Sequence, residues 1–395
     1  MTYKNKAFRR AAAAAAAICL AFAFAEETGA DRLGFGTSIT VSADDLEYNI
    51  GTAKITYTTD ANGNVTITKF DEGDETSIQI PETIDGGKVK TIGANAFADC
   101  SSLTSITLPQ SLTNIENLAF ARCTALQNIN IPQDVTNIGV SAFLRCKSLT
   151  NITIPSGVTS IKTSAFALCT SIKSIELPDH LVSIGNSAFT GCYSLESVVI
   201  PSGVTSVGEF AFSHCTSLAS ITLPPSVTSI GDDAFQGCTS LETAFFPRSA
   251  TLGTGSFPLN TAQIRYTKDS STGDVMIDRV QTSESSRTSI EIPETICGGT
   301  VTTLCPYSFD NCGILEKIKL PKTLTLIDRF AFRYCTSLKE IEIPQNVSVI
   351  GGDIFSNCTS LKTVYLPEGL SGSGIQDTVT KIYYLTAPPK PKQAL

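Results

Sequence analysis

Apolar residues recur along most of the chain at a period of 23 residues. The repeating unit reads P-x-x-V-T-x-I-G-x-x-A-F-x-x-C-x-x-L-x-x-I-x-L, and a phenylalanine stands three residues before each repeat cysteine. The register holds through two blocks, which the cysteines mark at Cys100, Cys123, Cys146, Cys169, Cys192, Cys215 and Cys238, and at Cys312, Cys335 and Cys358. Such a period predicts units that stack into a repeat solenoid, because one unit cannot bury its apolar side chains alone.

Each unit contains a segment with the alternation of a strand. Residues 195–200 carry the spacing L-x-x-I-x-L, in which alternate side chains point inward, and Pro201 ends the segment. Equivalent strands of successive units would pair in parallel at roughly 4.8 Å. Further along the unit, Gly208 permits a turn, and Phe212 and Cys215 are expected to fill the interior from a short helical turn. The pattern predicts parallel strands on one side of the solenoid and short helical turns on the other.

The 23-residue unit resembles the leucine-rich repeats of the BspA-like family, the bacterial surface type whose repeats carry A-F-x-x-C followed by L-x-x-I-x-L-P. The resemblance covers most of residues 80–370. It implies a curved leucine-rich repeat array with parallel strands on the concave face and short helical turns on the convex side. It also implies a secreted or surface protein from a family linked to adhesion and host interaction, and it implies no catalytic residues.

A second element interrupts the repeats and occurs twice. Residues 57–87 match residues 266–299, and both copies contain I-P-E-T. In the first copy, residues 55–59 and 65–70 alternate on either side of Asn62-Gly63, a tight-turn signal, so the element is predicted to be a β-hairpin. Such hairpins would cap the open ends of a solenoid. Before the second copy, a degenerate unit keeps Phe257 but has no cysteine, as expected where a stack closes.

The N-terminal residues have the three parts of a secretory signal peptide. Basic residues precede the apolar run Ala11–Phe24, and Ala23-Phe24-Ala25 supplies an A-x-A cleavage pattern, so the mature chain is expected to begin near Glu26. No later segment is apolar and long enough to span a membrane. We predict a protein that is secreted or held at the cell surface, with no integral membrane span.

These features divide the chain into six predicted segments. They are a signal peptide at 1–25; an N-terminal segment at 26–54; a cap hairpin with a seven-repeat array at 55–247; a degenerate closing unit or junction at 248–263; a second cap hairpin with a three-repeat array at 264–370; and a closing strand with a proline-rich tail at 371–395. The pattern leaves open whether the two arrays form one arc or hinge at the junction.

Composition narrows the function classes. Charged residues are 17% of the chain and hydrophobic residues 42%, which argues against disorder. A net charge of −8 gives no basic field for nucleic acid or anionic membranes. The sequence has two histidines, His180 and His214, and no G-x-S-x-G, Walker, G-x-G-x-x-G or H-E-x-x-H motif. We expect no enzyme, no cofactor and no metal site, the last because close cysteine pairs such as C-x-x-C are absent from the sequence.

The repeat cysteines leave two interpretations open. Cysteines of secreted proteins usually form disulfides, and cysteines one strand spacing apart lie within disulfide distance. Their side chains would nevertheless point in parallel among phenylalanine and leucine, so ten buried thiols are the favoured interpretation. Cys297 and Cys305 lie outside the period, and a local disulfide between them is a further alternative.

The concave strand face is the predicted binding surface, because the residues between the core positions of L-x-x-I-x-L project there as a continuous sheet. They are neutral and rich in hydroxyl and amide groups in the first array, whereas they alternate in charge from strand to strand in the second. The predicted ligand-binding residues are Asn128, Asn130, Asn151, Thr153, Glu176, Val199 and Phe245. Val199 and Phe245 are apolar among polar neighbours, and an aromatic anchor is a usual source of binding energy. For Phe245 an alternative is left open, in which the unit with Phe257 folds over it as a cap.

Two functions remain after these exclusions. The first is a binding protein that recognises an extracellular or cell-surface protein, or else a glycan, through the concave face. The alternative is a non-catalytic structural or self-associating envelope component, in which the repeats have no dedicated ligand. The sequence does not indicate the oligomeric state.

Overall fold

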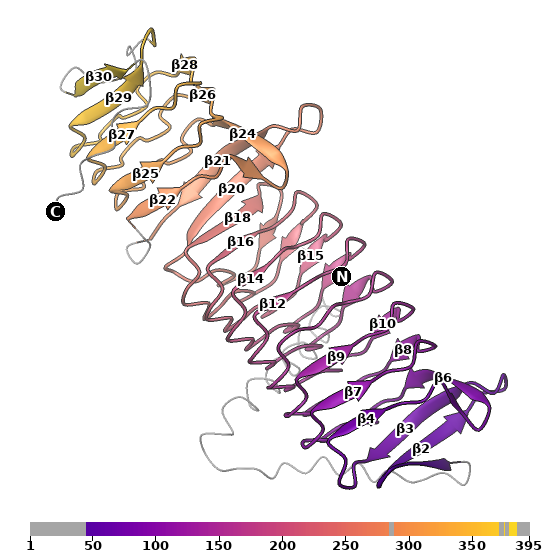
Figure 1. Ribbon diagram of the computed structural model, residues 1–395. Helices are drawn as coiled ribbons and strands as arrows, with labels where there is room; N and C mark the ends of the chain where they lie inside the picture. The colour runs from indigo at the N-terminus through magenta and orange to yellow at the C-terminus, as the bar shows by residue number, and fades with distance from the viewer. Residues whose placement is uncertain (1–44, 284–287, 371–374, 376–378, 385–395) are drawn as a thin grey trace, which may run out of the picture. The chain divides into compact units, whose positions relative to one another are not determined.

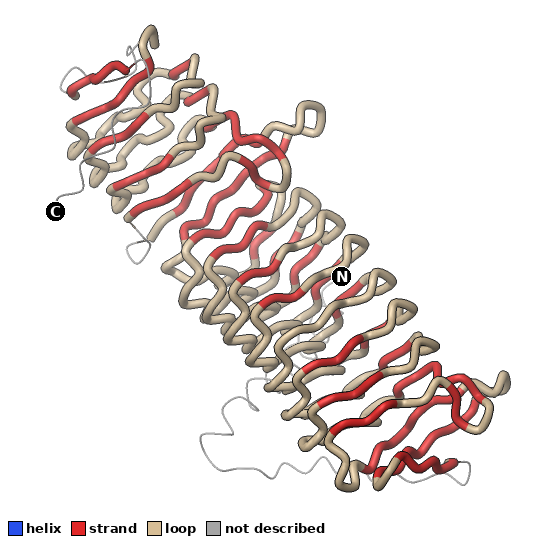
Figure 2. The backbone as a smooth tube through the Cα atoms, in the orientation of Figure 1, coloured by secondary structure: helices blue, strands red, loops and turns tan. Residues whose placement is uncertain are grey.

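The computed structural model describes residues 45–283, 288–370, 375 and 379–384. The predicted signal peptide, the expected start near Glu26 and the proline-rich end of the chain lie outside these residues. Within them the chain forms thirty strands, β1 to β30, joined by turns, and no helix (Figure 1 and Figure 2).

The chain divides into two compact units. The first comprises Met1–Leu218, Ser229–Ser240 and Thr251–Ser256, and the second comprises Ala219–Thr228, Leu241–Ala250 and Phe257–Leu395. Each is a β-solenoid built from the 23-residue repeat, with parallel strands from successive repeats. The division of the chain into six segments stays a prediction.

In the first unit, the L-x-x-I-x-L segments form a side of short parallel strands, as the alternation predicts. Ile106 pairs with Ile78 and with Ile129, so the same repeat position recurs from strand to strand, and all three side chains are buried. The strands are β4 (Ser77–Gln79), β7 (Ser105–Thr107), β9 (Asn128–Asn130), β12 (Ser174–Ile175) and β14 (Ser197–Val198). Single parallel bridges, Asn128 to Asn151 and Thr153 to Glu176, continue the pairing between β9 and β12.

The V-T-x-I segments form a second side of parallel strands in the first unit. These strands are β6 (Gly87–Ile92), β8 (Asn114–Ile115), β10 (Asn137–Ile138), β11 (Ser160–Ile161), β13 (Ser183–Ile184), β15 (Ser206–Val207), β17 (Ser229–Ile230) and β19 (Thr251–Leu252). Several threonines of this segment bond back to the preceding repeat; for example, the Thr205 hydroxyl donates to the Val182 carbonyl at 3.2 Å. These hydroxyl groups therefore stabilise the stack.

The A-F-x-x-C segment forms turns where short helical turns were predicted. The Phe120 amide donates to the Ala142 carbonyl of the next repeat at 2.8 Å, while the Cys123 amide donates within its own turn to Phe120 at 3.3 Å. Leu118 and Arg122 have φ angles of +60° and +63°, in the left-handed region. A right-handed helix requires negative φ at every residue, so it cannot pass through these positions. The helical-turn prediction was therefore wrong, because these amides are divided between the turn and the neighbouring repeat.

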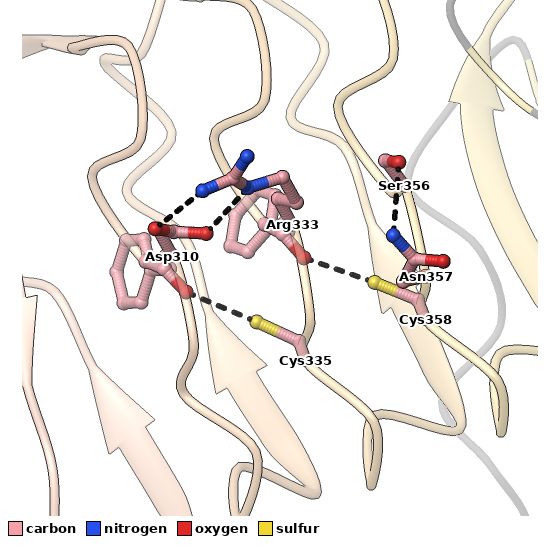
Figure 3. A network of polar contacts seen from close by, with 8 residues as sticks. Asp310, Arg333, Cys335, Ser356, Asn357 and Cys358 are labelled. Carbon is pink, nitrogen blue, oxygen red and sulfur yellow. Dashed lines mark hydrogen bonds and ion pairs between the residues drawn. The ribbon is translucent and has the colours of Figure 1, made fainter.

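The repeat phenylalanines and cysteines form two ladders through the core. The rings of Phe120 and Phe143 stack with centroids 5.3 Å apart and planes 7° apart, and both side chains are fully buried. The Cys146 thiol donates to the Phe120 carbonyl at 3.1 Å. In the second unit, Cys335 and Cys358 are directed in the same way at the preceding repeat (Figure 3). Each interior group thus contacts its equivalent one repeat away, which is why the register cannot slip within a block.

The predicted hairpins are present in both places. The first hairpin module consists of β2 (Ala53–Thr59), β3 (Val65–Asp71), β5 (Thr83–Ile84) and β6, with β1 (Leu46–Ile50) at its outer edge. The second consists of β20 (Ala262–Lys268), β21 (Val275–Gln281), β23 (Thr295–Ile296) and β24 (Gly299–Leu304). In each module the hairpin is antiparallel, and its second strand then pairs in parallel with the strand that begins the V-T-x-I series.

In the second unit, the hairpin module joins one kind of repeat strand to the other. The sheet runs in the order β16-β18-β20-β21-β24-β26-β28. Here β16 (Ser220–Thr222) and β18 (Thr243–Pro247) are L-x-x-I-x-L strands, whereas β26 (Leu326–Ile327) and β28 (Val349–Ile350) are V-T-x-I strands. On the L-x-x-I-x-L side, two further parallel sheets follow. One pairs β22 (Ser289–Glu291) with β25 (Lys317–Lys319), and the other runs in the order β27 (Glu340–Glu342), β29 (Thr363–Pro367) and β30 (Thr380–Tyr384).

Candidate binding surface

Six of the seven predicted binding residues lie exposed on one surface of the first unit. We call this surface the strand face; it is the outward side of the L-x-x-I-x-L strands from β4 to β14. Its predicted members are Asn128, Asn130, Asn151, Thr153, Glu176 and Val199. Val199 has 82% of its side chain exposed, the highest value among the large apolar residues that the structure describes.

Pairing between strands places these side chains next to one another. Asn128 lies opposite Asn151, and Thr153 lies opposite Glu176, each in the parallel register of successive repeats. One step further, Ser174 lies opposite Ser197, two residues before Val199. Neighbours in such a row stand roughly 4.8 Å apart. The strand face therefore presents a row of polar groups that ends beside an exposed apolar side chain.

The chemistry of the strand face is that of hydrogen bonding without a dominant charge. An asparagine amide offers both donors and acceptors, and threonine adds a hydroxyl that does either. The Asn151 amide donates to the Thr150 hydroxyl at 3.3 Å, and that hydroxyl lies 3.5 Å from the Asn128 amide oxygen, near the outer limit of a hydrogen bond. These long contacts hold the amides weakly, so exchanging them for bonds to a ligand costs little.

Phe245 is not part of the strand face, and its prediction as a binding residue is corrected. It lies in the second unit with only 6% of its surface exposed. Strand β20 extends the sheet past β18, so that Phe245 pairs with Ile264 and joins the buried core of that unit. The cap that covers Phe245 is therefore β20. Phe257, which sequence suggested as its cover, instead stacks on Phe246 with centroids 5.3 Å apart.

Sequence alone did not single out a second cluster, which lies on the turns of the second unit and is half-buried except for the exposed Tyr334. It contains Tyr307, Phe330, Arg333 and Tyr334. Figure 3 shows Asp310 paired with the arginine. These side chains come from the positions next to the repeat phenylalanine and cysteine. The available signal was their residue type, because most other repeats have small or polar residues at the positions of Tyr307 and Phe330.

The cysteines contribute packing to the structure. All twelve cysteines that the structure describes are free thiols, so neither the disulfide ladder nor a Cys297–Cys305 bond is present. Burial raises the pKa of the Cys192 thiol well above its usual value, and it raises that of Cys305 to about 11. A thiol in that state is a poor nucleophile at neutral pH. In the described part of the chain, no three His, Cys, Asp or Glu residues gather as ligands for a metal ion.

Comparison with known proteins identifies the repeat. A sequence model described as the BspA type leucine-rich repeat region matches in six copies, over residues 68–192, 159–270 and 278–381. No curated protein matches the chain.

Several solved structures are similar to the chain. A leucine-rich cell surface protein from Faecalibacterium prausnitzii is 28% identical, with 87% of this chain and 95% of that chain covered and a TM-score of 0.49. A leucine-rich repeat protein from Bacteroides ovatus is 25% identical, with 85% and 99% covered and a TM-score of 0.36. The pneumococcal vaccine antigen PcpA is 20% identical, with 86% and 85% covered and a TM-score of 0.32.

Proposed function

The chain belongs to the BspA type leucine-rich repeat family, and from this premise we propose a function. We propose that it is a secreted or cell-surface binding protein that recognises an extracellular protein through the strand face of the first unit. The observation that carries the proposal is the set of six exposed side chains on neighbouring strand positions, from Asn128 to Val199. Sheet geometry fixes their spacing, so a ligand would meet a rigid surface.

The size and composition of the strand face favour a protein ligand. Its strands from β4 to β14 span six successive repeats, which at the parallel-strand spacing makes a surface about 24 Å long. A protein interface needs roughly 800 Å² from each partner, and it combines polar groups with a few apolar anchors. Val199 is such an apolar group, set among amides and hydroxyls.

The proposed location follows from the N-terminal sequence. Residues 1–25 have the pattern of a signal peptide, which predicts export and supports a binding protein that acts outside the cell that makes it. Among the residues that the structure describes, none belongs to a helix with the length and apolar character needed to cross a membrane.

The proposal contains no catalytic step. The six exposed side chains are three amides, one hydroxyl, one carboxylate at Glu176 and one apolar group at Val199. The amides and hydroxyls around Glu176 are suited to recognition by hydrogen bonding.

The test is a charge introduced at two places on the strand face, one in its middle and one at its apolar end. We would measure binding of the full exported chain to an array of purified extracellular proteins, and then compare the double variant Asn151→Lys, Val199→Lys with the wild type. The two lysines are expected to weaken binding at least 30-fold, or about 2 kcal/mol, because they remove an apolar contact and bury unpaired charge.

A matched control keeps the two substitution types but moves them away from the strand face. Val182 is 48% exposed and lies on the V-T-x-I side, next to β13, and Gln133 is an exposed turn residue. Gln133→Lys with Val182→Lys should leave affinity unchanged. Equal affinity of both folded double variants would remove the strand face as the binding surface. Concentration-dependent sedimentation of the wild type that Asn151→Lys, Val199→Lys abolishes would instead support a self-associating component.

A further inference from the structure

The turn of every repeat contains two positions with a left-handed backbone. They stand five residues and one residue before the repeat cysteine, and φ lies between +52° and +72° at every one of them. Left-handed φ favours glycine, asparagine and aspartate and is costly for bulky side chains. Three repeats follow this preference at the first position, three have serine, and four have a bulky side chain; the residues are Asn95, Leu118, Ser141, Ser164, Ser187, Phe210, Asp233, Tyr307, Phe330 and Asp353.

The second unit has three aromatic residues close together at these positions. Tyr307 has φ +62°, Phe330 has φ +57°, and Tyr334, at the second position of the same repeat as Phe330, has φ +58°. The first unit has one aromatic ring at the first position, Phe210, and polar residues in both adjacent repeats. The stack imposes a left-handed φ at these positions in every repeat, also on bulky residues of the first unit such as Leu118 and Leu168. What distinguishes the second unit is that three aromatic rings gather at these positions.

The three rings surround one arginine. The rings of Tyr307 and Phe330 stack with centroids 5.2 Å apart and planes 13° apart. The Arg333 guanidinium carbon lies 4.9 Å from the Tyr307 ring centre, 5.9 Å from that of Phe330 and 5.3 Å from that of Tyr334. We call these four residues the aromatic patch. Its rings are separate from the core ladder, which continues beneath it through Phe309 and Phe332.

An ion pair fixes the centre of the aromatic patch. Arg333 donates from Nε to one oxygen of Asp310 at 2.7 Å and from Nη2 to the other at 3.0 Å, a two-pronged contact that Figure 3 shows from close by. Cation–π contacts hold the other side of the guanidinium. Because the arginine is both immobilised and neutralised, the aromatic patch offers a rigid surface of low net charge and loses little side-chain entropy on binding.

From this geometry we infer that the aromatic patch is a second binding site, and that its partner is a protein that buries an aliphatic or aromatic side chain against the rings. Tyrosine and arginine are enriched among the residues that dominate binding energy at protein interfaces. Tyr334 is 45% exposed, so contact area is available. Ser356 and Asn357, at the equivalent positions of the next repeat, are polar residues of the kind that surround an interface core (Figure 3).

The ring geometry and the ion pair exclude other partners. A sugar packs its C–H groups on an open ring face, whereas Tyr307 and Phe330 each turn one face to the other ring and Arg333 lies over Tyr307, which reduces the open ring area. A phosphate or an acidic peptide requires an unpaired arginine, whereas Arg333 is already paired with a carboxylate. The accessible surface consists of the exposed ring of Tyr334 and the partly exposed rings of Tyr307 and Phe330 beside a half-buried charge pair, which suits an apolar side chain of another protein. This inference does not depend on the strand face.

The first measurement separates a binding role from a structural one. In the variant Tyr307→Asn, Phe330→Asn, Tyr334→Asn, each new residue is one that other repeats already use at a left-handed position, as at Asn95 and Asn311. Relief of backbone strain should offset the lost ring contacts, so we expect a melting temperature within about 3 °C of the wild type. A fall of more than about 10 °C would show that the rings serve the stability of the stack and would overturn the inference.

The second measurement asks for binding directly, with a displayed library of random 15-residue peptides as the probe. The library is selected on the full exported chain, and clones are then compared on the triple variant and on Phe210→Asn, which removes a ring from the same repeat position in the first unit. We expect clones rich in leucine or aromatic residues that lose at least 30-fold in affinity on the triple variant and are unchanged on Phe210→Asn. Recovery of no clone with this dependence, or of acidic clones that depend on Arg333 alone, would overturn the inference. Clones lost only on Asn151→Lys, Val199→Lys would support the strand face and overturn the aromatic patch.

Discussion

The two hairpin modules share their local geometry and differ in what lies at their outer edge. Both hairpins shift register at the same place, between Thr56 and Tyr57 in the first and between Arg265 and Tyr266 in the second. In the first unit, strand β1 covers the outer edge in the antiparallel sense. In the second unit, β18, the last repeat strand before the hairpin, covers the equivalent edge in parallel. One local structure therefore serves both as a terminal cap and as an internal connector.

The conserved tyrosine position shows what the outer neighbour changes. Tyr57 in the first module donates its hydroxyl proton to the carboxylate of Asp85, an exposed residue. Tyr266 in the second module donates to the Leu223 carbonyl at 2.6 Å, and Cys297 stands where the first module has Asp85. The internal module thus ties its tyrosine to the backbone of a preceding repeat, whereas the terminal module ties it to its own loop. We expect interior positions to be held more firmly than terminal ones.

The largest expected effect is the loss of unfolding free energy when the core phenylalanine of a middle repeat is replaced by alanine, compared with the same change in an end repeat. Phe166 stacks on both Phe143 and Phe189, at 5.4 and 5.7 Å. Phe166→Ala should cost about 3–5 kcal/mol of stability, the usual range for a buried phenylalanine that leaves a cavity. Phe355→Ala should cost clearly less, because a terminal repeat frays without disturbing the others. Equal losses in denaturant titrations would contradict the contrast between interior and end.

A smaller effect is expected for the two tyrosine hydroxyls. Tyr266→Phe removes the short hydrogen bond to the Leu223 carbonyl and leaves it only the weak contact from the Cys297 thiol at 3.8 Å, which should cost about 1–3 kcal/mol. Tyr57→Phe releases Asp85 to water, so its cost should stay below about 1 kcal/mol. Urea unfolding of the two variants measures both values. A larger loss for Tyr57→Phe would reverse the assignment of the internal module as the firmer one.

The same tyrosines predict how stability changes at alkaline pH. Burial and the Asp85 carboxylate raise the pKa of Tyr57 from 10.0 to about 12, and burial raises the pKa of Tyr266 further. Because the folded state keeps the phenol protonated, its contribution to stability is complete below pH 10 and is lost as the pH rises toward 12. Tyr57→Phe should therefore reduce the loss of stability between pH 9.5 and about 11.5, which urea midpoints at the two pH values would show. An undiminished loss would mean that Tyr57 ionises normally.

The smallest expected effect is at the exchanged loop residue. Asp85 and Cys297 both have φ of +48°, a conformation that aspartate adopts more readily than cysteine. Cys297→Asp should be neutral or stabilising by about 0.5 kcal/mol, since it gives the second module the residue of the first. The change in the urea midpoint measures it. Destabilisation by more than about 1 kcal/mol would show that the half-buried thiol has a packing role of its own.

Much of the fold is predictable from sequence because each repeat position has one physical role. Alternation identified the L-x-x-I-x-L strands, and the Asn62-Gly63 turn between alternating segments identified the first hairpin, both of which the structure confirms. The same alternation placed Asn128, Asn151 and Val199 at exposed positions, where they are found. Their role in binding stays a prediction. Strands of two residues, such as Ser160–Ile161, are too short for any period to reveal.

The remaining features depend on contacts that a linear pattern does not contain. Tyr334 and Arg122 are residue types that give no indication of a left-handed backbone. In the structure both have positive φ, and both backbone amides donate to carbonyls of the next repeat. Phe245 has the pattern of an exposed residue, but β20, which begins at Ala262, covers it. The rings of Tyr307 and Phe330 lie 23 positions apart in sequence and meet only after stacking. In each case the deciding contact comes from another part of the chain.

The cysteine ladder has a consequence for how such a chain changes in length. Each thiol in the first block from Cys123 to Cys238 bonds to a carbonyl 26 positions earlier, and the same offset recurs at Cys335 and Cys358. If 23 consecutive residues were removed from within a block, each remaining thiol would still have a phenylalanine carbonyl 26 positions earlier. Every interior thiol would therefore keep a hydrogen-bond acceptor of the same kind. In-frame loss or duplication of one repeat unit in the gene would then produce a shorter or longer protein with an intact interior. Genetic changes in repeat number would therefore change the length of the protein by whole repeats, and every repeat would keep the same interior hydrogen bonds.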